Sequence, residues 1–147
     1  GALAAAGSPL PTSKNAACAK EILGIYVDGK TSTGKAAWSG FDYRRMEPSY
    51  AWVAQLQAGY DRAAIAGITN FAMGENLNNP IDTKQMIGGV AVTHWARVYE
   101  PIRDLIAKMK KNGFDVWIVS ASPQTMIEIW AMTVDVAADH VIGIRNL

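Results

Sequence analysis

The sequence predicts an α/β protein in which a helical region precedes part of a parallel sheet. Three observations lead to this fold class. An amphipathic helix pattern opens at Pro101, a short apolar run follows at 114–119, and the helix–strand alternation then repeats as far as residue 145. Such alternation is typical of a parallel, doubly wound sheet. Two strands cannot complete that sheet, so we expect further strands from polypeptide outside this chain and an exposed apolar edge on the partial sheet.

The elements after residue 98 follow from their end signals. Lysines cluster at the end of the predicted 101–111 helix, where the helix dipole favours cations, and Gly113 suits the residue that ends it. The run FDVWIV at 114–119 is typical of a buried parallel strand. Ser122 is expected to cap the next helix, with Pro123 in its first turn, and 140–145 is expected to be the second strand.

The first 98 residues are predicted to be mainly helical. Helices are expected at 15–27, from Pro48 onward, and from an N-cap at Asp61 until the polar stretch 74–80 interrupts the last of them. A loop rich in Gly, Ser, Thr and Lys occupies 28–40, and 82–98 shows no single pattern. We therefore divide the chain into a helical region, 1–98, and a partial α/β core, 99–147.

Composition narrows the function classes. The chain has 147 residues, of which 50% are hydrophobic and 18% charged, and its net charge is +1. These values argue against a disordered chain. They also show no excess of positive charge of the kind that binds nucleic acid. No apolar run reaches the ~18 residues of a membrane span. Cys18 is the one cysteine, which excludes an internal disulfide, and the two histidines lack partners at zinc-ligand spacing.

The sharpest motif is the end of the 114–119 strand, where Ser120, Ala121 and Ser122 follow. In open α/β sheets, ligands bind beyond the carboxyl ends of the strands. A hydroxyl and backbone N–H groups beside a helix N-terminus form an anion site, and phosphate is a frequent occupant. The alternative is that Ser120 merely ends the strand and Ser122 merely caps the helix.

The run YEPIRDLIAKMKKNGFDVWIVSASPQTMIEIWAMTVDVAADHVIGIR at 99–145 resembles the haloacid dehalogenase (HAD) superfamily, in its phosphoserine-phosphatase-like branch. Four linked parts carry the resemblance: an aromatic-acidic-Pro helix start, a Lys-rich helix end with Asn-Gly, the strand ending in Ser-Ala-Ser, and the Ala-Asp-His-Val-Ile-Gly strand. The resemblance implies a Rossmannoid core and places 15–98 where such phosphatases insert a helical cap.

The resemblance also implies a mechanism. In the family, an Asp attacks phosphorus to form an aspartyl-phosphate, a second Asp moves protons, and Mg²⁺ with a Lys neutralises the phosphoryl oxygens. Here Ser120 would donate its hydroxyl to a phosphoryl oxygen, and the Ala121 N–H would bind the same group. The family's Asp-x-Asp-x-Thr nucleophile motif is absent from this sequence. We therefore expect a middle fragment of a phosphatase, inactive alone, whose Mg²⁺ ligands and remaining core lie outside this chain.

The cap would select the substrate, a small phosphomonoester. The stretch 37–60 is similar to caps of bacterial phosphorylcholine-phosphatase-like members, which slightly favours an extracytoplasmic or secreted location. Aromatic faces beside carboxylates suit a quaternary ammonium group, so phosphocholine is a candidate substrate. Packing in the cap core is the alternative role for the aromatics, and Arg44 would meet a phosphate or a solvated surface. The predicted substrate-binding residues are Trp38, Asp42, Tyr43, Arg44 and Glu47.

Two other readings stay open at this point. The chain could be a non-catalytic helical module for ligand binding or assembly, or a HAD relative with other chemistry, such as phosphoryl transfer or dehalogenation. The sequence upstream of this chain would separate them. An Asp-x-Asp-x-Thr motif there would exclude the non-catalytic module, whereas a single Asp without its partner would favour a dehalogenase.

Overall fold

A computed structural model describes residues 12–39 and 47–145. The chain forms two compact units, which we describe separately. Unit 1 contains the described residues up to Tyr60 together with Lys84–Thr93, and unit 2 contains Asp61–Thr83 and His94–Arg145. The predicted division into a helical region, 1–98, and a partial α/β core, 99–147, stays a prediction. Among the described residues, none of the helices is both long and apolar enough to cross a membrane.

Unit 1 begins with helix α1, Ala16–Asp28, which confirms the helix predicted at 15–27 to within one residue. The Asn15 side chain accepts a hydrogen bond from the Cys18 backbone N–H at 3.0 Å and so caps the helix start. The helix ends at Gly29, whose φ of 64° lies in the left-handed region that glycine adopts without steric cost. α1 contacts helix α2, Pro48–Gln55, and strand β1, Lys84–Ile87.

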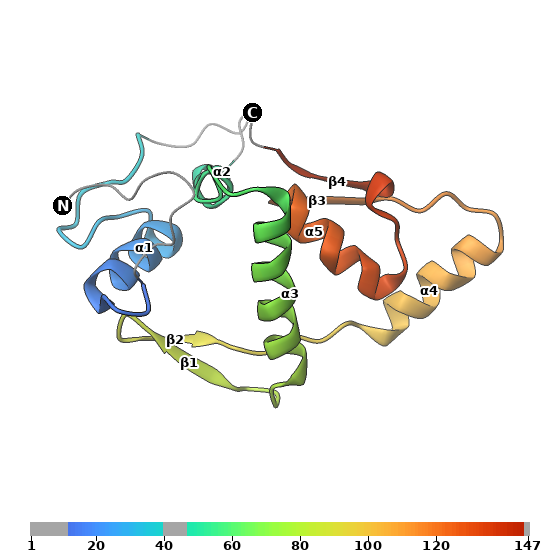
Figure 1. Ribbon diagram of the computed structural model, residues 1–147, viewed down its shortest axis with the longest axis horizontal. Helices are drawn as coiled ribbons and strands as arrows, with labels where there is room; N and C mark the ends of the chain where they lie inside the picture. The colour runs from blue at the N-terminus through green and yellow to red at the C-terminus, as the bar shows by residue number, and fades with distance from the viewer. Residues whose placement is uncertain (1–11, 40–46, 146–147) are drawn as a thin grey trace. The chain divides into compact units, whose positions relative to one another are not determined.

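A β-hairpin completes unit 1 (Figure 1). β1 pairs antiparallel with β2, Val90–Thr93, and Ile87 faces Val90 across the turn. Gly88 and Gly89 form this turn with φ of 57° and 82°, as a two-residue turn of this kind requires. A Cβ on Gly88 would lie 2.4 Å from the Lys20 backbone nitrogen, so the turn packs directly on α1. The sequence left 82–98 unassigned because two four-residue strands are too short to show a period.

Unit 2 begins with helix α3, Arg62–Asn78. Asp61 caps it as predicted, since its Oδ1 accepts from the Ala64 N–H at 2.7 Å. The predicted interruption at 74–80 is wrong, because α3 continues through Gly74 to Asn78. A glycine inside a helix costs only about 1 kcal/mol, and stabilisation at the helix end offsets that cost. Here the Arg97 guanidinium donates to the carbonyl oxygens of Leu77 and Asn79 at 3.1 and 2.6 Å.

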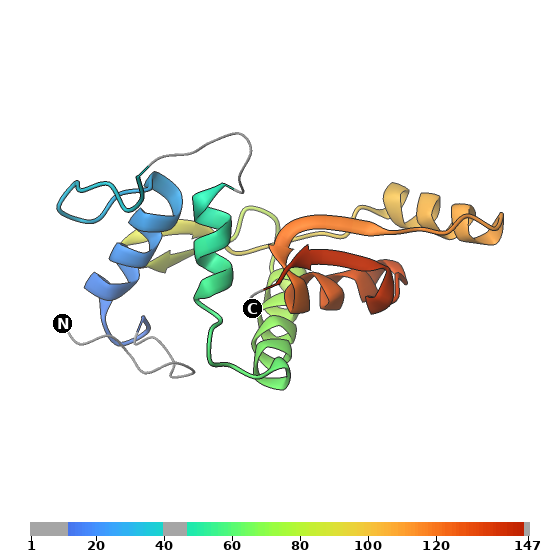
Figure 2. The same ribbon diagram turned by 90° about the horizontal axis from the view of Figure 1, so that it is seen from above.

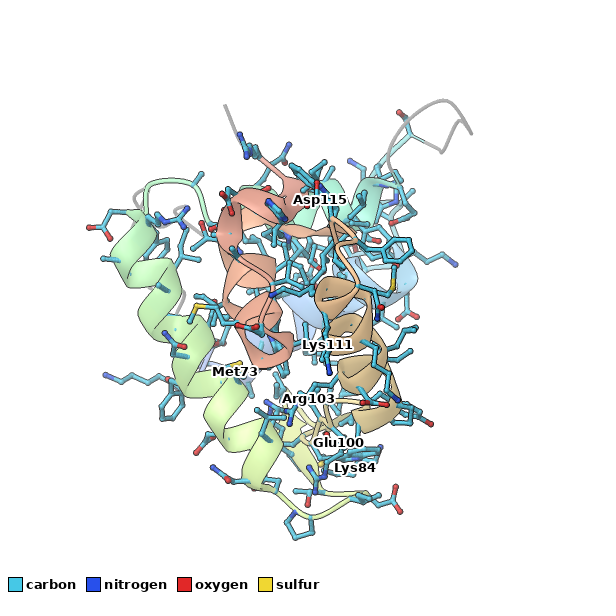
Figure 3. The ribbon with its side chains drawn as sticks, turned by 90° about the vertical axis from the view of Figure 1, so that its right-hand side faces the viewer. Met73, Lys84, Glu100, Arg103, Lys111 and Asp115 are labelled. Carbon is cyan, nitrogen blue, oxygen red and sulfur yellow. The ribbon has the colours of Figure 1, made fainter. Side chains whose placement is uncertain are left out.

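Helix α4, Glu100–Lys111, confirms the amphipathic helix predicted from Pro101. Its lysines lie in the last turn, and Gly113 follows with a φ of 80°. Figure 3 labels Glu100 and Arg103 in the first turn, where they form an ion pair at 3.2 Å, and Asp115 beyond the other end of the helix.

The parallel sheet of unit 2 consists of β3, Ile118–Pro123, and β4, Val141–Ile144. Helix α5, Gln124–Ala131, lies on one face of this pair (Figure 2), and two short 3₁₀ turns, Met132–Val134 and Ala138–His140, lead to β4. α3 packs against α5. The buried core comprises Ala131, Val136 and Val141, with partly buried neighbours from α4, β3 and α5. The predicted α/β class is therefore confirmed.

The opposite face of the sheet is exposed and apolar. Val119 and Ile142 are register partners, and they are 76% and 50% exposed. Ile118 and Val141 form the neighbouring pair, and Val141 is 2% exposed. Since successive residues of a strand point to opposite faces, one face of the pair is covered and the other is open.

Two local predictions are wrong. The strand expected at 114–119 lies at 118–123, because residues 114–117 have no paired strand among the described residues and leave Phe114 and Trp117 exposed. The helix then begins at Gln124 rather than at Pro123, which has an extended ψ of 136° and is the N-cap. Ser122 consequently lies inside β3, too far ahead of α5 to cap it, and no side-chain hydrogen bond caps this helix.

Candidate functional site

Ser120 and Ala121 lie in the middle of β3, where its pairing with β4 is irregular. The Ser120 Oγ accepts a hydrogen bond from the Ser122 backbone N–H at 3.1 Å. That bond occupies a lone pair of the hydroxyl and leaves its hydrogen without an acceptor among the described residues. Ser120 is half-buried and Ala121 is exposed. This part of the strand therefore offers a hydroxyl donor next to an exposed residue.

Helix α5 follows β3 without a connecting loop. The first turn of this helix has no side-chain cap. The helix dipole makes such an end favourable for an anion. A phosphoryl or carboxylate group that reached both Ser120 and this end would meet a hydroxyl and the positive end of a helix.

The Gln124 side chain joins α5 to β4. Its Oε1 accepts from the Gly143 N–H at 2.7 Å, and its Nε2 donates to the Val141 carbonyl oxygen at 3.0 Å. The ladder between β3 and β4 is irregular between Val119 and Pro123, and the Gln124 amide takes the place of a backbone peptide beside that interruption. Gly143 is needed there because a Cβ would lie 2.8 Å from the Ser122 carbonyl oxygen.

The buried Glu128 carboxylate forms a hydrogen bond with the Gln124 side chain. The Glu128 Oε1 accepts from Gln124 Nε2 at 2.7 Å, and its Oε2 lies 2.5 Å from an Arg62 Nη at the start of α3. The Glu128 side chain is 9% exposed, so the cation compensates a charge removed from water. Sequence reasoning missed these three residues. The one available signal was a Gln and a Glu four positions apart on an otherwise apolar helix.

The predicted substrate-binding residues that the structure describes, Trp38 and Glu47, belong to unit 1. The Trp38 ring lies 6.3 Å from the Trp52 ring, centroid to centroid, at an interplanar angle of 55°. The Glu47 carboxylate caps α2, because its Oε2 accepts from the Ser49 N–H at 2.9 Å. Both residues thus have structural contacts within their unit. Asp42, Tyr43 and Arg44 lie outside the described residues.

Two stacked rings join the residues that precede β3 and β4. The Trp117 and His140 rings are parallel within 4°, with centroids 4.7 Å apart. Both rings also approach the Asp115 carboxylate, the Trp117 Nε1 at 2.7 Å and the His140 Nδ1 at 3.1 Å. His140 therefore has a structural environment. Within residues 12–39 and 47–145, no cluster of three His, Cys, Asp or Glu side chains is arranged to hold a metal ion.

Comparison with protein families supplies a match for the part of the chain that contains β3, α5 and β4. Residues 58–146 match the family model described as haloacid dehalogenase-like hydrolase. The match spans more than half of the chain. No curated protein and no solved structure matches the chain.

Proposed function

This chain belongs to the haloacid dehalogenase-like hydrolase family, and from that premise we propose that it is part of a Mg²⁺-dependent phosphatase acting on a small phosphomonoester. The reaction would pass through an aspartyl-phosphate, with the nucleophile supplied by polypeptide outside this sequence. The observation that carries the proposal is the Ser120 hydroxyl on β3, which accepts a hydrogen bond from the Ser122 N–H on the strand that leads into α5.

Ser120 would act on the phosphoryl oxygens. Because its Oγ already accepts one hydrogen bond, the hydroxyl hydrogen is directed toward a second partner, for which a non-bridging phosphoryl oxygen is suited. The Ala121 N–H would donate to the same group. Donors set in advance toward developing charge stabilise a transition state without having to reorganise during the reaction.

The described residues do not fit a magnesium site, since they contain no suitable cluster of acidic side chains. Magnesium dependence is therefore proposed from family membership alone, and we assign no step of the reaction to the metal through this chain.

Phosphocholine is the substrate we propose within the phosphoserine-phosphatase-like branch. The support is the group of aromatic and acidic residues at 38–47, where Trp38 and Tyr43 would face the quaternary ammonium group and Asp42 or Glu47 would balance its charge. Arg44 would meet an anionic part of the substrate. Trp38 lies beside Trp52 and Gly29 and is half-buried, so part of its surface is accessible for such a contact.

Substitution of Ser120 tests the phosphoryl role. In the longer protein carrying this chain, Ser120→Ala is expected to lower kcat for p-nitrophenyl phosphate by about 10²–10³, the loss typical of removing one oxyanion donor. Ser122→Ala is the matched control, because it removes a neighbouring hydroxyl but keeps the N–H that binds Ser120. Equal activity in wild type and Ser120→Ala would refute the assignment. The 147-residue chain alone is expected to show no turnover with Mg²⁺.

A second experiment tests the substrate. Trp38→Ala and Tyr43→Ala are expected to raise KM for phosphocholine about tenfold, equivalent to about 1.4 kcal/mol in binding, and to leave KM for p-nitrophenyl phosphate nearly unchanged. That second substrate has no cation for the aromatic rings to recognise. Equal losses on both substrates, accompanied by a lower melting temperature, would instead assign the rings to packing.

A further inference from the structure

Unit 1 contains a groove of about 580 Å³ that the proposed phosphatase reaction does not use. It lies between α1, the loop after it and strand β2, and the residues lining it all belong to unit 1. Its volume falls within the range of sites that bind small molecules.

The walls of the groove combine aliphatic surface with positive charge. Leu23, Val27 and Val92 form an apolar wall, and Val27 is 70% exposed. Lys20 and Lys30 also line the groove, and neither ammonium group pairs with a carboxylate among the described residues. Asp28 is the one acidic residue in the lining, which leaves a net positive charge.

The loop that closes one side of the groove is fixed by its own hydrogen bonds. The Thr31 N–H donates to the Lys35 carbonyl oxygen at 2.9 Å, and the Ser32 N–H donates to the Glu21 carboxylate on α1 at 2.8 Å. Hydrogen bonds from the side chain and the backbone of Ser32 lower the pKa of Glu21. Lys30 is therefore presented from a preformed loop, which reduces the entropy cost of binding.

We propose that this groove binds a small amphiphilic anion, an aliphatic chain that ends in a phosphate or a carboxylate. The chain would lie along Leu23, Val27 and Val92, and the head group would meet Lys20 and Lys30. A cationic head group would face two ammonium groups and one carboxylate. The site is independent of Ser120 and of the proposed hydrolysis.

Calorimetric titration of the 147-residue chain tests the proposal. Hexyl phosphate and hexanoate are the two anionic probes, and either is expected to bind with a stoichiometry of one; their relative affinity identifies the preferred head group. Ethyl phosphate is expected to bind at least tenfold more weakly than hexyl phosphate, since each buried methylene contributes about 0.8 kcal/mol. Hexyltrimethylammonium is the matched probe of opposite charge and is expected to bind at least tenfold more weakly too.

Variants locate the head group. Lys20→Gln and Lys30→Gln are each expected to raise the Kd of hexyl phosphate about fivefold, the upper range for an exposed ion pair. Lys35→Gln is the matched control, because Lys35 belongs to the same loop but does not line the groove. Amide chemical shifts of the unsubstituted chain give a second readout, with changes expected at Gly24, Gly34 and Val92. The proposal is overturned if neither anion binds, if the cation binds as tightly, or if the shifts fall elsewhere.

Discussion

Gln124 shows how one side chain can replace part of a backbone ladder. Its amide forms hydrogen bonds with the Gly143 N–H, the Val141 carbonyl oxygen and the Glu128 carboxylate, and it is 8% exposed. A buried polar group that loses its partner costs about 1–3 kcal/mol. The residue therefore matters for the strand pair that ends at the proposed phosphoryl site.

Replacement of Gln124 by leucine is expected to lower the free energy of unfolding by about 3 kcal/mol or more, because it leaves the Gly143 N–H, the Val141 carbonyl and the Glu128 carboxylate without their partner. Urea denaturation followed by circular dichroism measures this loss. The matched control is Gln55→Leu, at an exposed glutamine at the end of α2, which is expected to change stability by less than about 0.5 kcal/mol. Similar stabilities for both variants would contradict the bridging role.

At the scale of elements, Arg97 stabilises the end of α3. Arg97→Ala is expected to lower the free energy of unfolding by about 1–2 kcal/mol, since it removes a cation that donates to terminal carbonyls and complements the helix dipole. Urea denaturation measures the change. Arg103→Ala removes the same side chain from α4, where its one ion pair with a described residue is the exposed one with Glu100. This change is expected to cost less than about 0.5 kcal/mol.

The sequence predicted elements whose signals are local. The Asp61 cap, the lysines at the end of α4 and Gly113 all act within one helical turn, and each occurs where expected. The errors arise where contacts with residues distant in the sequence determine the bounds of an element. Gly74 stays helical in an element whose last carbonyls are bound by Arg97, and β3 is displaced toward Ser122 because β4 and Gln124 set its pairing.

The candidate site, like the fold, was predictable only in part. Ser120 and Ala121 were expected just beyond a strand at 114–119, from the rule that ligands bind beyond strand ends, but in the structure both lie inside β3, which continues to Pro123. Their roles remain proposals. The network of Gln124, Glu128 and Arg62 could not be predicted, because its members are joined by packing between α3 and α5 rather than by spacing in the sequence.

At the scale of the whole molecule, the open sheet face favours association. Val119 and Ile142 expose apolar surface beside each other, and Trp117 and Phe114 are also exposed in the segment that leads into β3. We expect the sedimentation coefficient of the 147-residue chain to rise with concentration. Val119→Lys is expected to reduce that rise without lowering the melting temperature by more than a few degrees, since a charge on an open sheet blocks edge and face contacts.

Val27→Lys provides the comparison for this experiment, because Val27 is a valine on α1 that is 70% exposed, against 76% for Val119. It is expected to leave the concentration dependence unchanged. If both lysine variants sediment like the wild type, the β3–β4 face is not the surface of association.

The route of the chain through its two units has a further consequence. The polypeptide leaves unit 1 after Tyr60, forms α3, returns for the hairpin Lys84–Thr93 and leaves again. Neither unit is therefore a continuous segment, and no single cut separates them. A piece starting at 99 would lack the helix that packs on α5, and a piece ending at 60 would lack the hairpin whose Gly88 rests on α1. Because that contact closes a loop of more than sixty residues, unit 1 is expected to finish folding only after α3 and the hairpin have been synthesised.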